Sequence, residues 1–234
     1  MIDEHYCNPK LAALFDSDCP WGEDKDFYLA LPKLAQSTIL DIGCGTGQLS
    51  EAYASLGHNV LGIDPAAAML EVARSKPHGS IIEWQQASAQ NFATPHKFDL
   101  IVMTGHVFQT LLNVNDVDRS LARIAAHLKP GGQFVFESRT PNIDWFAKWK
   151  ANVEIGREFI AIADTPSRKT FERKYILPDQ THVSRSELQF WSEAEIRQQL
   201  SNTGLVVRRF LGDWSGNDFD PNKSEEMIFV TSLS

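Results

Sequence analysis

Three glycines and a later aspartate form the clearest chemical pattern in the sequence. Gly43, Gly45 and Gly47 fall within five positions after the apolar run TILDI (38–42), and Asp64 stands 17 residues beyond the last glycine. Each glycine weakens a helix or strand by up to ~1 kcal/mol, so the cluster needs a turn with positive φ or a ligand close to the main chain. A carboxylate after the next apolar run is suited to ribose hydroxyls. A ligand-free turn, with Asp64 capping a helix, is the alternative.

The spacing of these glycines excludes two kinds of nucleotide site. A dinucleotide fingerprint would place its third glycine at position 48, which is Gln. A P-loop would continue with Gly-Lys-Ser or Gly-Lys-Thr, and none follows. The loop is therefore typical of neither a nicotinamide dehydrogenase nor a P-loop enzyme.

A second group of polar residues follows the later apolar runs. His106 and Gln109 lie in TGHVFQTL (104–111), directly after FDLIVM (98–103). His106 is a candidate general base because an imidazole titrates near neutrality, with a packing or solvent-facing role as the alternative. Gln109 is a candidate for orienting an acceptor molecule.

Three further residues are candidates for the same region. Glu137 and Arg139 end the run QFVFE (133–137) and follow it, where they would bind a substrate or pair with each other. Tyr28 precedes the first apolar run and would cover the site or join the core. No histidine–carboxylate cluster has metal-ligand spacing, so we expect no metal.

The elements that would position these residues alternate between strands and helices. Apolar runs predict the strands 38–42, 59–64, 80–85, 97–103 and 133–137. Helical periodicity predicts the helices 8–16, 24–36, 49–56, 66–74 and 117–128. This alternation is typical of βαβ units and a parallel sheet covered on both faces, with ligands beyond the carboxyl ends of its strands.

The pattern changes near residue 140. Residues 140–191 hold two β-like runs around a PDQ turn, which predict an added hairpin, and the alternating residues 183, 185, 187 and 189 predict a solvated polar face. Ser192 and Glu195 have capping-box spacing for a helix that ends near Gly204. The strands 205–211 and 225–233 follow.

We therefore expect an α/β fold: a doubly wound, mostly parallel sheet of seven strands, with an added β-hairpin and an N-terminal helical segment. The expected organisation is a single domain. It comprises an N-terminal helical lid (1–36), a cofactor-binding core (37–138), the hairpin region (140–191), and a C-terminal helix with the last two strands (192–234).

Composition restricts the partners of the protein. A formal charge of −8 over 234 residues disfavours binding to nucleic acid, because affinity for phosphate backbones comes from Lys and Arg. The start of the chain lacks the apolar core of a signal peptide, and no stretch approaches the ~18 apolar residues of a membrane span. The three cysteines include no CxxC pair. We expect a cytoplasmic protein with no membrane partner; oligomeric state is not encoded in any pattern.

Taken together, the motifs resemble those of the class I S-adenosylmethionine-dependent methyltransferases. ILDIGCGTG (39–47) is similar to the first motif of that family, and GIDPAAAML (62–70) is similar to the second. ASAQNF (87–92) stands at the third region, with Ser88 where Asp is usual. FDLIVM (98–103) and LKPGGQFVF (128–136) match two later segments, so the resemblance spans roughly residues 37–138.

The resemblance implies S-adenosyl-L-methionine as cofactor, S-adenosyl-L-homocysteine as product, and specific roles for the motif residues. Asp41 would steady the glycine loop or reach the cofactor ammonium, and the backbone from Gly43 to Gly45 would lie against the methionine portion. Asp64 would hold the ribose hydroxyls. The remaining residues expected around the cofactor are Cys44, as a small turn residue, with Pro65, Ser88, Ala89 and Thr104.

The leading hypothesis is an enzyme that methylates a small-molecule acceptor, with His106, Gln109, Tyr28 and Glu137 as candidate catalytic residues. A nucleic-acid methyltransferase is the second hypothesis, although the chain has MTGH (103–106) where amino-methylating enzymes of that kind usually carry Asn/Asp-Pro-Pro-aromatic. A non-catalytic cofactor-binding module is the third. The acceptor atom is not specified by the fold.

Overall fold

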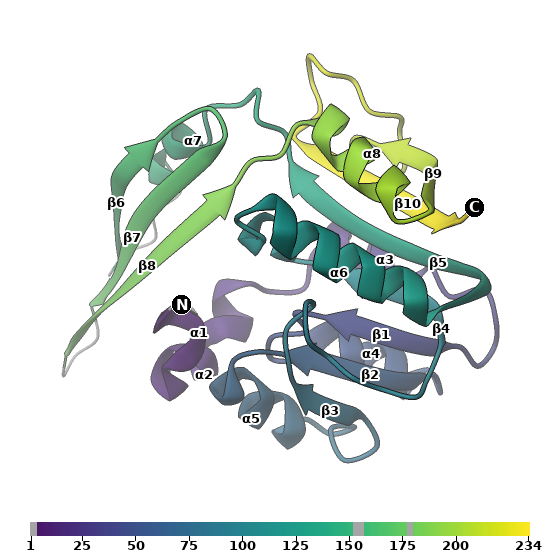
Figure 1. The fold of residues 1–234 in the computed structure, drawn as a ribbon. Coiled ribbons are helices and arrows are strands. Elements are labelled where there is room, and N and C mark those ends of the chain that lie inside the picture. The colour runs from purple at the N-terminus through teal and green to yellow at the C-terminus, as the bar shows by residue number, and fades with distance from the viewer. Residues whose placement is uncertain (1–3, 152–156, 177–179) are drawn as a thin grey trace.

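The computed structural model describes residues 4–151, 157–176 and 180–234, which form two sheets with helices around the larger one (Figure 1). The larger sheet has seven strands in the order β3-β2-β1-β4-β5-β10-β9. Its strands are β1 (Thr38–Ile42), β2 (Asn59–Asp64), β3 (Glu83–Gln86), β4 (Phe98–Met103), β5 (Leu128–Arg139), β9 (Leu205–Leu211) and β10 (Glu226–Leu233). The predicted doubly wound, mostly parallel seven-stranded sheet is confirmed.

The strands up to β5 pair in parallel, and β10 runs antiparallel between β5 and β9. Because β10 is antiparallel, its first residues lie at the edge where β4 and β5 end. Glu226 consequently stands directly opposite Arg139. This register brings two residues that are far apart in the sequence to one edge of the sheet.

Helices cover both faces of the larger sheet, as the alternation predicts. The helices are α1 (Glu4–Cys7), α2 (Pro9–Asp18), α3 (Glu23–Leu29), α4 (Gln48–Ser55), α5 (Ala67–Ser75), η1 (Val107–Thr110), α6 (Val114–His127), α7 (Trp145–Ala151) and α8 (Glu193–Asn202). Leu40 and Ile42 of β1 pack in the apolar cluster that includes α6 and α8. Ile39 packs in the cluster that includes α3 and α4. The side chains of this one strand thus pack into two apolar clusters, one on each face of the sheet, which explains its unbroken apolar run.

Several predicted elements end or begin elsewhere than expected; the strand predicted at 133–137, for example, is β5, which spans Leu128–Arg139. The helix predicted at 24–36 ends at Leu29, because Pro32 cannot continue it and disfavours helical backbone before it. The strand predicted at 80–85 begins at Glu83; Ile81 lies in a turn and is 68% exposed. The capping box of Ser192 and Glu195 is present at the start of α8.

The region after residue 140 differs most from the prediction. The predicted hairpin is part of an antiparallel sheet of three strands: β6 (Arg157–Asp164), β7 (Arg168–Ile176) and β8 (Thr181–Gln189). The hairpin β7–β8 is the predicted pair, and its PDQ turn falls largely on residues 177–179, outside the described residues. β6 adds the third strand, so β7 is central. Figure 1 shows this small sheet standing apart from the larger one, with α7 on it.

Candidate functional site

The glycine loop joins the end of β1 to the start of α4, and all three glycines have positive φ. A Cβ on Gly43 would lie 2.5 Å from Val107 Cγ2, and one on Gly47 would lie 2.5 Å from Trp84 Cη2. A Cβ on Gly45 would meet only Phe15, at 3.8 Å. Gly43 and Gly47 therefore permit close packing, whereas Gly45 permits the backbone turn itself.

Asp64, at the end of β2, is tied to this loop. Its carboxylate accepts hydrogen bonds from the backbone N–H of Gly45 (3.0 Å) and of Ala66 (2.8 Å). Burial raises the pKa of Asp64, and these two backbone hydrogen bonds oppose that rise. The aspartate thus fixes the loop against the start of α5. Two oxygens, each with a second lone pair, remain suited to vicinal hydroxyls.

Asp41 lies beneath the loop with one unsatisfied oxygen. Its Oδ2 accepts a hydrogen bond from Ser50 (2.6 Å), whereas its Oδ1 is buried and has no partner among the described residues. Burial raises the pKa of Asp41 to about 6, the Ser50 hydrogen bond opposes the rise, and the charge of Asp64 adds to it. An unpartnered buried carboxylate oxygen is costly unless a donor or a cation satisfies it. The site therefore fits a ligand with a cationic group.

The other residues expected around the cofactor lie in the same region. Burial raises the pKa of the Cys44 thiol well above its ordinary value, which favours a packing role. The Pro65 carbonyl accepts a hydrogen bond from the Gln86 side chain (3.2 Å). Thr104 follows β4 directly and is partly buried.

At the third motif, Ser88 is held in a turn. Its N–H and hydroxyl both donate to Asn91 Oδ1, at 2.8 and 3.0 Å. Ala89 is buried in the apolar cluster under α6. The serine hydroxyl thus already has a partner within the protein, and a contact of Ser88 or Ala89 with the cofactor stays a prediction.

Sequence reasoning missed an anchor from the N-terminal helices. Asp16 of α2 accepts hydrogen bonds from Thr46 and Gln48 of the glycine loop region and pairs with Lys76. Phe15 lies over Gly45. No spacing in the sequence relates Asp16 to residues 30 or more positions away, so only the packing of α2 reveals this contact.

At the carboxyl ends of β4 and β5, a buried carboxylate connects three elements. Glu137 is 1% exposed and accepts hydrogen bonds from the Tyr28 hydroxyl and from the backbone N–H of His106 (2.6 Å). Burial raises the pKa of Glu137, and His106 and Tyr28 oppose that rise. The structure thus brings the predicted candidates Tyr28, Glu137 and His106 together, from α3, β5 and the loop after β4.

His106 has φ of 62°, the only positive φ of a non-glycine residue in the described chain. Its Nε2 lies 2.9 and 3.0 Å from the two carboxylate oxygens of Glu226. Burial alone would raise the pKa of Glu226, but the charge and hydrogen bond of His106, with Arg139 and Lys148, hold it below its ordinary value. Strained backbone of this kind persists where surrounding contacts over-determine it, often at functional sites. No spacing or motif in the sequence points to Glu226.

Gln109 is fully buried and forms a bridge rather than a free contact. Its Oε1 accepts a hydrogen bond from Arg139 Nη1 (3.0 Å), and its Nε2 lies 3.4 Å from the Gln189 carbonyl. The predicted role of Gln109 towards an acceptor therefore passes through Arg139. The pairing of Glu137 with Arg139, one of the two alternatives for these residues, is not formed as an ion pair within the described residues.

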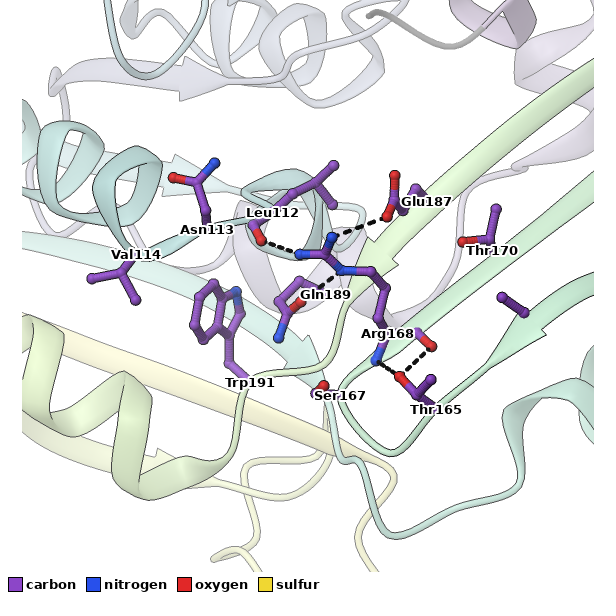
Figure 2. Close-up of a pocket in the computed structure, with 11 residues that line it drawn as sticks. Leu112, Asn113, Val114, Thr165, Ser167, Arg168, Thr170, Glu187, Gln189 and Trp191 are labelled. Atoms are coloured by element: carbon purple, nitrogen blue, oxygen red, sulfur yellow. Dashed lines mark hydrogen bonds and ion pairs between the residues drawn. The ribbon is translucent and has the colours of Figure 1, made fainter.

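A separate pocket of about 660 Å³ lies between the start of α6 and the face of the small sheet that carries Thr170 and Glu187. Figure 2 shows Arg168 in its middle, donating to Leu112, Glu187 (3.1 Å) and Gln189 (3.1 Å). Of the alternating stripe predicted to be a solvated face, Val183, Arg185 and Glu187 are exposed, and only Gln189 is buried. Glu187 and Gln189 both line this pocket. The polar groups here mostly satisfy one another, and the pocket shares no residue with the glycine loop.

Within the described residues, no group of three or more His, Cys, Asp or Glu side chains is arranged to hold a metal ion. The helices of that same part of the chain include none of the length and apolar character needed to cross a bilayer.

Comparisons with known sequences identify the family of this chain. Residues 39–132 match a family model described as a methyltransferase domain. A ubiquinone biosynthesis O-methyltransferase of Bradyrhizobium sp. (strain ORS 278) is 31% identical over 97% of this chain and 86% of its own length. One of the same name from Rhodopseudomonas palustris (strain BisB18) is 29% identical over 95% of this chain and 82% of its own.

Solved structures share the fold. An S-adenosylmethionine-dependent methyltransferase from Clostridium acetobutylicum ATCC 824 has a TM-score of 0.73, 18% identity, and coverage of 97% of this chain and 99% of its own. The S-adenosylmethionine-bound amino pentose methyltransferase CalS10 from Micromonospora echinaspora has a TM-score of 0.63 at 18% identity, with coverage of 94% and 97%.

Proposed function

The chain belongs to the class I S-adenosylmethionine-dependent methyltransferases, and on that premise we propose which residues serve the reaction and which atom is methylated. The protein is an S-adenosylmethionine-dependent enzyme that methylates a small molecule. The observation that carries the assignment of the cofactor end is the glycine loop flanked by Asp41 and Asp64, with Asp41 Oδ1 buried and unpartnered.

The cofactor, when bound, supplies a methyl group on a sulfonium, whose leaving group needs no further activation. We assign its ammonium to Asp41, its ribose hydroxyls to Asp64, and its methionine portion to the backbone from Gly43 to Gly45. Cys44, Pro65, Ser88, Ala89 and Thr104 line the remainder. α2 holds the loop in place through Asp16.

We assign the acceptor to the edge formed by the ends of β4 and β5 and the start of β10, and we propose a hydroxyl oxygen as the atom methylated. A hydroxyl must lose a proton as its oxygen forms the new bond, so a base is useful. His106 Nε2 is held by Glu226, which leaves Nδ1 as the proton-accepting atom in the tautomer that donates to the carboxylate. The relatives named as O-methyltransferases support an oxygen acceptor.

Tyr28 and Glu137 set the position of this base. Glu137 holds the backbone N–H of His106, and the Tyr28 hydroxyl completes the carboxylate's hydrogen bonds. We propose that both are positioning residues and that Gln109 positions Arg139. We also propose that the four segments named above act as one domain, that the enzyme works in the cytoplasm, and that its net charge of −8 disfavours nucleic acid as acceptor.

Calorimetric titration with S-adenosylmethionine and S-adenosylhomocysteine, followed by methyl transfer from tritiated cofactor, tests this function. We expect both cofactor forms to bind and the label to enter small hydroxylated compounds, such as catechols, but not RNA. NADH serves as the control nucleotide. Binding of NADH instead of S-adenosylmethionine would contradict the cofactor assignment, and label entering RNA alone would favour the nucleic-acid enzyme.

A further inference from the structure

Arg139 is a basic side chain at the acceptor edge that the reaction as proposed does not use. It stands opposite Glu226 across the β5–β10 pair, where two such side chains ordinarily form an ion pair. Instead, Glu226 binds His106 and Arg139 binds Gln109. Throughout the described chain, no carboxylate oxygen lies within 4.0 Å of the Arg139 guanidinium. The Arg139 side chain is therefore held by a hydrogen bond, and no carboxylate forms an ion pair with its positive charge.

The guanidinium is held by two tryptophans. Its central carbon lies 5.4 Å from the ring centre of Trp145 and 5.4 Å from that of Trp149, both on α7. Within the described residues, only Nη1 forms a side-chain hydrogen bond, to Gln109. Arg139 is partly exposed, and its other N–H groups are not among the buried atoms that lack a partner, so they remain open to a ligand. A rigid, partly buried guanidinium with open donors is suited to bidentate recognition of an oxyanion.

A second arginine, Arg173, contacts the same group of aromatic rings. Arg173 lies on the face of β7 that also carries Phe171, and its guanidinium lies 5.3 Å from the Phe171 ring centre. Burial lowers the pKa of Arg139, Glu226 and Glu137 oppose that change, and the positive charge of Arg173 adds to it. An anion bound at Arg139 would offset this repulsion between the two cations.

From this arrangement we infer that the methyl acceptor carries an anionic group, a carboxylate or a phosphate, which Arg139 binds with Arg173 alongside. The inference rests on the proposed function, since it names the class of acceptor for the same site. The anion would sit beside the base, because Glu226 lies opposite Arg139 and holds His106.

The aromatic side chains near Arg139 indicate the kind of molecule that carries the anionic group. Trp149 lies 5.1 Å from Phe171 and 6.0 Å from Phe159, measured between ring centres. Trp149 is partly exposed and packs on these two phenylalanines, so it offers an aromatic surface beside the guanidinium that favours a flat, apolar body. The acceptor class that fits is therefore an aromatic acid or aryl phosphate bearing a hydroxyl.

Calorimetric titration of four probes of similar shape tests the inference: benzoate, phenyl phosphate, benzamide and benzylamine. The protein is saturated with S-adenosylhomocysteine, and each titration is repeated without it. We expect benzoate or phenyl phosphate to bind at least tenfold more tightly than benzamide, with the better of the two identifying the anion. Arg139→Gln should abolish the preference, Arg173→Gln should reduce it severalfold, and Arg139→Lys should retain part of it.

Arg185→Gln is the matched control. Arg185 is exposed on β8, and it lies on the face of the small sheet opposite to the one that carries Arg173. It should leave the preference unchanged. Equal binding of benzoate and benzamide, tighter binding of benzylamine, or no binding of any probe would overturn the inference, as would an unchanged preference in both Arg139→Gln and Arg173→Gln. Loss of S-adenosylhomocysteine binding in Arg139→Gln would place the guanidinium at the cofactor instead. Failure of the wild type to bind S-adenosylhomocysteine would contradict the proposed function separately.

Discussion

The cofactor end and the acceptor end of this sheet are built in different ways. The cofactor end, which comprises β1, the glycine loop and β2, is a single continuous stretch from Thr38 to Asp64. The acceptor end joins residues far apart in the chain: Tyr28 and Glu137 are 109 positions apart, and His106 and Glu226 are 120. A binding site built from residues close together in the sequence can be recognised as a motif. A site whose residues are brought together by the order of strands in the sheet has no such motif.

The two ends also differ in which charge they leave unsatisfied. At the cofactor end, the unpartnered group is a carboxylate oxygen of Asp41. At the acceptor end, both glutamates are engaged by His106 or Tyr28, and the group with open donors is Arg139. On the assignments proposed above, one end is suited to a cation and the other to an anion. The predictions below test that contrast.

The largest effect is expected at Asp64. Asp64→Ala should weaken S-adenosylmethionine binding by about 10- to 100-fold, because it removes ribose hydrogen bonds and releases the N–H groups of Gly45 and Ala66. Calorimetry measures the change. Asp213→Ala, at an exposed loop aspartate, is the control and should bind normally. Equal affinities for Asp64→Ala and wild type would show that the cofactor end lies elsewhere.

Glu137→Gln should cost about 2 kcal/mol of unfolding free energy, since an amide cannot accept both donors that the buried carboxylate satisfies. Urea unfolding measures it. Tyr28→Phe removes only one of those donors and should cost less. A larger loss in Tyr28→Phe than in Glu137→Gln would argue against Glu137 as the centre of the acceptor end.

Asp41 should make cofactor binding depend on pH. Its pKa is about 6 in the free protein, and a bound cation would lower it, so binding below pH 6 must displace a proton. Affinity should therefore fall about tenfold from pH 7 to pH 5, with about half a proton released per site at pH 6. Titrations in two buffers of different ionisation enthalpy measure the release. Proton uptake at pH 6, or release that persists in Asp41→Asn, would contradict this.

At His106, two substitutions separate backbone strain from chemistry. His106→Gly should be more stable than His106→Ala by about 1 kcal/mol, because glycine adopts positive φ without strain. Both should lose turnover, since neither has an imidazole. Thermal unfolding gives the first comparison and tritium transfer the second. Full activity in His106→Gly would show that the acceptor needs no base at this position.

The smallest effect is expected at Ser88. Its hydroxyl already donates to Asn91, so Ser88→Ala should change cofactor affinity by about twofold or less. A tenfold loss, measured by the same calorimetry, would give this turn a direct part in binding the cofactor and bring it into the cofactor end.

Particular elements show how far the sequence could be interpreted. The strands 38–42, 59–64 and 205–211 begin and end where apolar runs predict them. β6 was missed because its residues are mostly exposed, so its hydrophobic pattern has no buried face to report. Gln109 was identified as a candidate, but its partner Arg139 and the bridge to Gln189 depend on where the small sheet docks.

The sequence by itself determined the parallel sheet, the glycine loop and the choice of cofactor, because each depends on interactions within one short segment and on the burial of a strand on both faces. Tertiary structure alone decided that Asp16 supports the loop, that Glu226 holds His106, and that Arg139 keeps open donors. Those contacts follow from the antiparallel insertion of β10 and the packing of α2. Long-range packing of this kind places side chains together without any regular spacing along the chain.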